Sequence, residues 1–86
     1  MSDKMQKWYE NESALITQRG MLADSEKQLA WLRGPENTQA NNPDYDLTEN
    51  DIEYLESEIR ELKRDIAKLE EYFEKHPTPP AGEAEL

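Results

Sequence analysis

The residues best spaced to do chemistry lie between Asn42 and Glu53, where oxygen-bearing side chains recur at alternate positions. Asn42, Asp44, Asp46, Thr48, Asn50 and Glu53 fit positions 1, 3, 5, 7, 9 and 12 of a calcium-binding loop. However, Leu47 stands where the sharp turn of such a loop needs glycine, and Pro43 lies inside it. We therefore interpret these side chains as turn and helix-start residues, and we predict no metal site and no cofactor.

A catalytic centre is not predicted either. His76 is the single histidine, and the chain contains no cysteine. A general base needs a partner within hydrogen-bond reach, and sequence spacing places none beside His76. No glycine-rich phosphate loop and no nucleophile motif is present. We therefore expect a protein that is not an enzyme and has no catalytic residues.

The negative charge of the chain is concentrated in its second half. The net charge is −10, and residues 1–33 contribute nothing to it because their acidic and basic side chains balance. This charge disfavours direct binding to nucleic acid or anionic membrane and favours partners with basic surfaces. Residues 44–58 contain seven acids and no base, among them Glu53, Glu56 and Glu58. We take these three glutamates as candidate binding residues.

The clearest structural pattern lies in residues 48–76, which we predict to form a helix. Its apolar residues alternate spacings of three and four, which is typical of a coiled-coil seam. They are Ile52, Leu55, Ile59, Leu62, Ile66, Leu69 and Phe73. Thr48 is expected to cap the start of this helix, and Pro77 to end it.

A second, less regular helix is predicted for residues 3–33. One apolar row recurs every seven residues and contains Met1, Trp8, Leu15, Leu22 and Leu29; a second row, one residue later, contains Tyr9, Ile16, Ala23 and Ala30. Gly20 is a candidate bend, since glycine destabilises a helix interior. Gly34 and Pro35 should end the helix, and a polar loop is expected over residues 34–47.

The fold predicted from these patterns is all-α: an antiparallel, coiled-coil-like hairpin of two helices. It occupies residues 1–76, and a proline-rich, extended tail follows over residues 77–86. The antiparallel arrangement brings Trp8 level with Phe73 and Leu29 level with Ile52. The alternative is a parallel dimer of the second helix, in which two of three flanking charge pairs would repel.

In this hairpin Leu55, Leu62 and Leu69 fall opposite the charged residues Glu26, Arg19 and Glu12, so we expect them to lack apolar partners. A second protein surface should then cover these leucines together with Tyr9 and Ile16. The simplest such surface is another copy, which predicts a homo-oligomer. Trp31 lies off both rows and is a candidate partner contact.

The function expected is therefore a non-enzymatic protein–protein interaction module: an assembly factor, a small structural subunit or an adaptor. It would use apolar helix seams together with an acidic surface. The alternative is an acidic, nucleic-acid-mimicking inhibitor of a nucleic-acid-binding protein, of the kind that viruses encode. Since no run of ~18 apolar residues is present and no apolar run follows the N-terminus, we expect a cytoplasmic protein without membrane contact.

Overall fold

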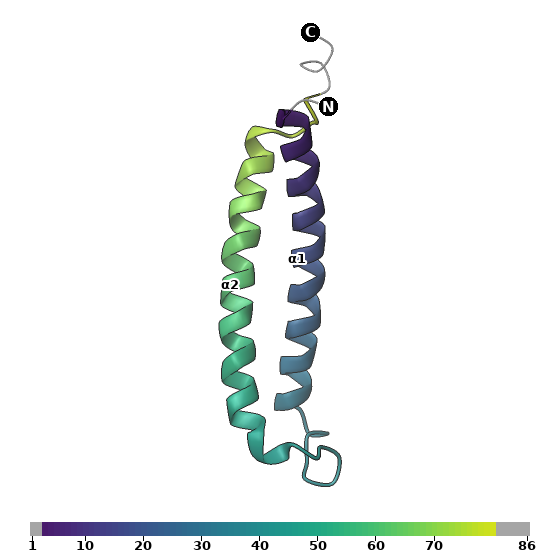
Figure 1. Ribbon diagram of the computed structural model, residues 1–86. Helices are drawn as coiled ribbons and strands as arrows, with labels where there is room; N and C mark the ends of the chain where they lie inside the picture. Colours follow the sequence, from purple (N-terminus) through teal and green to yellow (C-terminus); the bar gives the residue numbers. More distant parts are fainter. Residues whose placement is uncertain (1–2, 81–86) are drawn as a thin grey trace.

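The computed structural model describes residues 3–80, which form two long helices packed side by side (Figure 1). Helix α1 spans Asp3–Arg33 and helix α2 spans Thr48–Lys75, and a short 3-10 helix, η1, spans Tyr45–Leu47. The two long helices run antiparallel and make a rod with extents of 64 × 17 × 17 Å. The prediction of an all-helical antiparallel hairpin is confirmed.

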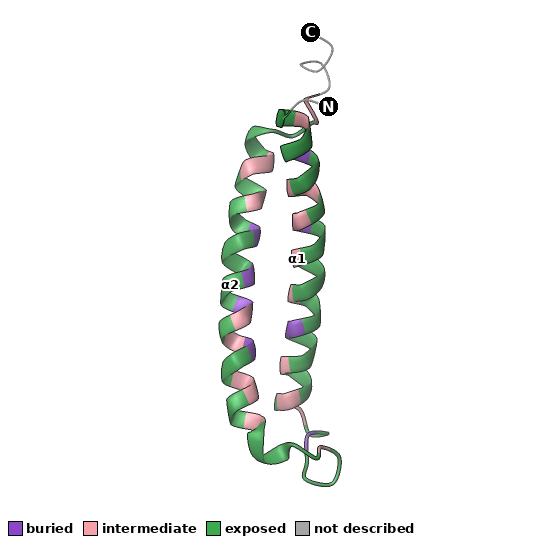
Figure 2. Cartoon of the chain, viewed as in Figure 1, coloured by how far each residue is buried: buried purple, intermediate pink, exposed green. Residues whose placement is uncertain are grey.

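The core is a narrow seam between the helices (Figure 2). Its buried residues on α2 are Leu55, Ile59, Leu62 and Ile66, and α1 contributes Trp8 and Leu15. Each such side chain contributes about 1.5–3 kcal/mol when it is fully buried. The predicted stripe of the second helix is therefore the face that packs against α1. Gly20 does not interrupt α1, which is helical throughout Asp3–Arg33.

Four contacts fix the register of the two helices. The rings of Trp8 and Phe73 pack edge to face with centroids 5.3 Å apart, as the predicted layer requires. The Trp8 indole Nε1 also donates a hydrogen bond of 2.8 Å to the His76 carbonyl oxygen. On the flank, Arg19 pairs with Glu70 at 3.2 Å and Arg33 with Glu56 at 2.9 Å.

The expectation that the α2 leucines lack cover within the hairpin is wrong for Leu55 and Leu62, which are 6% and 7% exposed. Leu69 is half-buried. The reason is the face that α1 presents. The positions of α1 that turn inward between its apolar residues are Asn11, Gln18, Ser25 and Leu32, whereas Arg19 and Glu26 stay exposed. Uncharged side chains can pack beside leucine, so α1 itself covers Leu55 and Leu62.

One of these inward positions carries an unsatisfied polar atom. The amide oxygen Oε1 of Gln18 is buried, and within residues 3–80 it has no hydrogen-bond partner. A buried polar group without a partner costs about 1–3 kcal/mol. Gln18 therefore lowers the stability of the hairpin.

The loop after α1 is tied together by the buried side chain of Asn37. Its Nδ2 donates to the Leu32 carbonyl oxygen at 2.8 Å and to Thr48 Oγ1 at 3.1 Å. Its Oδ1 accepts a hydrogen bond of 2.9 Å from Asn42 Nδ2. Asn37 thus connects the last turn of α1 with the first residue of α2, and this joins the helices at the closed end.

The ends of α2 differ slightly from those predicted. Thr48 does not cap the helix, because η1 places it inside the first turn, where its hydroxyl donates to the Tyr45 carbonyl oxygen at 2.7 Å. The capping position is Leu47, which makes no side-chain cap. The helix ends at Lys75, one residue before the predicted end, since Pro77 disfavours helical backbone at His76. Of the predicted tail, residues 77–80 are non-helical and residues 81–86 lie outside the described part.

Candidate functional site

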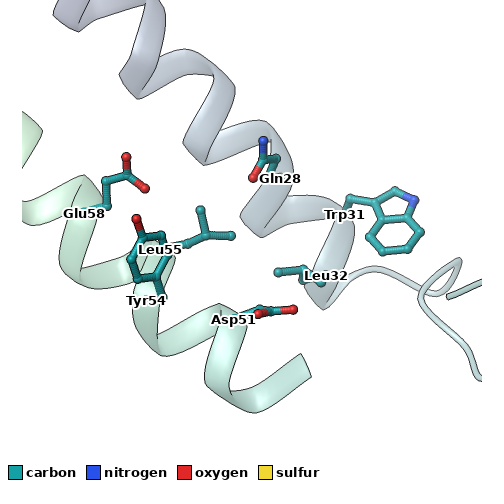
Figure 3. Close-up of a pocket in the computed structure, with 7 residues that line it drawn as sticks. All are labelled: Gln28, Trp31, Leu32, Asp51, Tyr54, Leu55 and Glu58. Atoms are coloured by element: carbon teal, nitrogen blue, oxygen red, sulfur yellow. The ribbon is translucent and has the colours of Figure 1, made fainter. Parts of the chain in front are cut away.

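A groove opens between the two helices near the loop end of the hairpin (Figure 3). It has a volume of about 440 Å³ and is lined by Gln28, Trp31, Leu32, Asp51, Tyr54, Leu55 and Glu58. Leu32 and Leu55 point toward each other from opposite helices. The groove is therefore a continuation of the apolar seam that the hairpin leaves open to the outside.

Its aromatic walls follow from the antiparallel packing. Trp31 directly precedes the inward residue Leu32, and Tyr54 directly precedes the inward residue Leu55. In an antiparallel pair of helices, residues that precede the seam residues lie on the same side of both helices. Trp31 and Tyr54 therefore flank one groove, although they are 40% and 69% exposed. Two large aromatic rings are left without full cover by the chain itself.

The charge of the groove is negative. Asp51 and Glu58 are its only ionisable carboxylates, and no lysine or arginine is among the residues that line it. Both belong to α2, whose first turn also contains Glu49, and Asp44 and Asp46 precede this helix in the chain. Aromatic faces beside carboxylates attract cationic side chains through both charge and the ring quadrupole.

The other predicted binding residues are divided among different surfaces. Tyr9 and Ile16 lie exposed on the outer side of α1, far along the chain from the groove. Leu55 lines the groove, whereas Leu62 is enclosed in the seam. Of the residues predicted to bind, only Trp31, Leu55 and Glu58 come together in this site.

The three candidate glutamates also have different surroundings. Glu53 is exposed, Glu56 is paired with Arg33 at 2.9 Å, and Glu58 lines the groove. The pair with Arg33 offsets one of the three charges. A continuous strip of free carboxylates, which a mimic of nucleic acid would need, is therefore interrupted at Glu56.

Residues that sequence reasoning did not select complete the groove: Gln28, Leu32, Asp51 and Tyr54. A signal for Tyr54 was available, since Trp31-Leu32 and Tyr54-Leu55 repeat the same aromatic–leucine pair on two helices predicted to be antiparallel. Met21 is also exposed and lies one heptad before Gln28, so apolar surface continues along α1.

Two of the residues that fit a calcium-binding loop, Asn42 and Thr48, use their side chains for hydrogen bonds within the chain. Asn42 donates to Asn37, its Oδ1 accepts from the Asp44 backbone N–H at 3.0 Å, and Thr48 is bonded to Tyr45. Within residues 3–80, no group of three or more histidine, cysteine or acidic side chains could hold a metal ion. His76 packs its ring against Tyr72, with centroids 4.6 Å apart.

Comparison with known protein families, with curated proteins and with solved structures finds no match. Neither long helix of the described chain has an apolar stretch of the length needed to cross a bilayer. The site must therefore be interpreted from its own geometry: an open, apolar-floored groove with two aromatic walls and two carboxylates.

Proposed function

We propose that the hairpin is a non-enzymatic protein–protein interaction module whose groove binds a basic, amphipathic helix of a partner protein. The observation that carries this proposal is that Trp31 and Tyr54, both exposed, line the same groove as Leu32 and Leu55. Tryptophan and tyrosine are enriched among the residues that dominate binding energy at protein interfaces. An apolar groove between helices is a known receptor for amphipathic helices.

The charge of the groove specifies the partner further. Asp51 and Glu58 would pair with lysine or arginine beside the partner's apolar anchors, and the chain's net charge of −10 would speed the encounter. Arginine is favoured over lysine, because its planar group can also stack on Trp31 or Tyr54. The bound segment should therefore carry apolar residues at helical spacing with basic residues on their flanks.

An unbiased selection tests this chemistry without a known partner. A library of random peptides is selected for binding to the wild-type chain and counter-selected against a Trp31→Ala/Tyr54→Ala double variant. Both replaced side chains are exposed in the hairpin, so the variant should keep its helicity, which circular dichroism checks. We expect the enriched peptides to be basic, with apolar residues at spacings of three and four.

Two matched variants separate the contributions of the groove. Asp51→Asn/Glu58→Gln keeps the shape and removes the charge, so it should weaken binding of the selected peptides and reduce its dependence on salt. Ile16→Ser removes a comparably exposed apolar side chain outside the groove and should leave binding unchanged. Enrichment of acidic peptides, or the absence of any enriched peptide after counter-selection, would refute the proposal.

The same selection without the counter-selection step examines the nucleic-acid-mimicking alternative. Peptides rich in arginine and lysine but without apolar anchors would point to it if they bind the double variant unchanged. Binding of these peptides should then be lost when Glu53, Glu56 and Glu58 are replaced by lysine. Duplex DNA should also compete with the protein for the same basic peptides. That pattern would replace the groove proposal.

A further inference from the structure

The outer side of α1 has an apolar row that the hairpin does not cover. Tyr9, Ile16, Ala23 and Ala30 recur every seven residues, and all four are exposed, with Ile16 at 65%. Gly20 lies on the same side, and a methyl group added there would meet no atom within 4 Å. This face shares no residue with the groove, and its centre consists of small residues that allow another backbone to approach closely.

A row of alternating charge runs beside these residues. Glu12, Arg19, Glu26 and Arg33 are also spaced by seven, three positions after the members of the apolar row. Two helices related by a two-fold axis perpendicular to their length bring each such row against its own reverse. An acid–base–acid–base row then meets base–acid–base–acid, so that Glu12 faces Arg33 and Arg19 faces Glu26. The row is therefore complementary to a second copy of itself.

The same alignment fits the apolar row. When Glu12 is level with Arg33 of a second copy, Ile16 lies within one residue of the level of Ala30, and Ala23 lies within one residue of the level of the second copy's Ala23. The one large aliphatic side chain of the row thus lies close to a small one, and the two-fold axis passes next to Ala23 of both copies. Arg19 and Arg33 keep their bonds to Glu70 and Glu56 and have side chains that are still more than half exposed. A guanidinium group has enough donors for a second carboxylate.

Charge also decides which helix two copies can share. Residues 3–33 contain five acidic and five basic side chains, whereas α2 contains ten acidic and five basic ones. Two copies that approach through α2 repel each other, and two that approach through α1 do not. We propose that the chain forms a two-fold dimer in which α1 pairs antiparallel with α1 of a second copy, Ala23 against Ala23 and Ile16 against Ala30.

The solution mass of the untagged chain tests the dimer first. Light scattering should give twice 10.1 kDa for the wild type. Ile16→Asp places a charge in the middle of the pairing and should raise the dissociation constant by about 100-fold or more, with unchanged helicity. Tyr54→Asp is the matched control, because it replaces a similarly exposed apolar residue of the groove and should leave the dimer intact. A wild-type mass of 10.1 kDa at the highest soluble concentration overturns the proposal.

Single cysteines test the orientation, since the chain has none of its own. Ala23→Cys should form an intermolecular disulfide under mild oxidation, because the two copies of this position face each other. Ala30→Cys should not do so alone, but it should cross-link to Ile16→Cys when the two variants are mixed. A parallel pairing would instead cross-link Ala30→Cys as readily as Ala23→Cys, and that result would overturn the antiparallel arrangement.

Discussion

The side chain of Asn37 should contribute more to stability than any other residue of the loop. It makes three hydrogen bonds, to the Leu32 carbonyl oxygen, to Thr48 Oγ1 and from Asn42 Nδ2. At about 0.5–1.5 kcal/mol for each bond, Asn37→Ala should lower the free energy of unfolding by about 2–4 kcal/mol. For a chain of this size that corresponds to a fall in melting temperature of at least ~10 °C.

Urea unfolding followed by circular dichroism measures this loss directly. The matched control is Asn41→Ala, which removes one exposed hydrogen bond, from Asn41 Nδ2 to the Glu36 carbonyl oxygen, and should cost less than about 1 kcal/mol. If Asn37→Ala unfolds at the same urea concentration as Asn41→Ala, the loop does not join the helices in the way described. In that case Asn37→Ala would leave every buried polar group of the loop with a hydrogen-bond partner.

Three further predictions concern the seam. Gln18→Met replaces a buried, unsatisfied amide by an apolar side chain of similar length and should raise the free energy of unfolding by about 1–2 kcal/mol; an unchanged or lower value in urea unfolding would contradict this reading. Leu62→Ala should lower it by about 2–5 kcal/mol, because Leu62 is enclosed within one chain; a loss that depends on protein concentration alone would place Leu62 in an intermolecular interface instead. In fluorescence, acrylamide should quench Trp31 in a Trp8→Phe variant much more strongly than Trp8 in a Trp31→Phe variant, since Trp8 is buried and Trp31 is exposed; equal quenching would show that the register is different.

The second helix was predictable because its sequence pattern allows only one choice of buried face. Isoleucine and leucine alternate in a heptad stripe with charged residues elsewhere, so only one face can be buried. The first helix offered two readings of its inner face. Its second inward row contains Asn11, Gln18 and Ser25, which periodicity of apolar residues does not detect, and the apolar row with Tyr9 and Ile16 proved to be exposed.

The loop and the groove illustrate what sequence spacing leaves out. Thr48 has the residue type of a helix cap, but the 3-10 turn before it changes its position by one residue and gives its hydroxyl another partner. The sequence marks Trp31 because it lies off both apolar rows, whereas periodicity alone does not mark Tyr54 beside Leu55. The groove depends on the two helices together, so its lining became visible only once their relative register was known.

The binding of a selected peptide, mapped on the isotope-labelled protein by nuclear magnetic resonance, tests the central proposal most directly. We predict that the largest chemical-shift changes occur at the Trp31 indole and at the backbone amides of Tyr54 and Leu55, with small changes at Tyr9 and Ile16. Changes centred on the outer side of α1, or spread over all exposed acids without a maximum at the groove, would contradict the account.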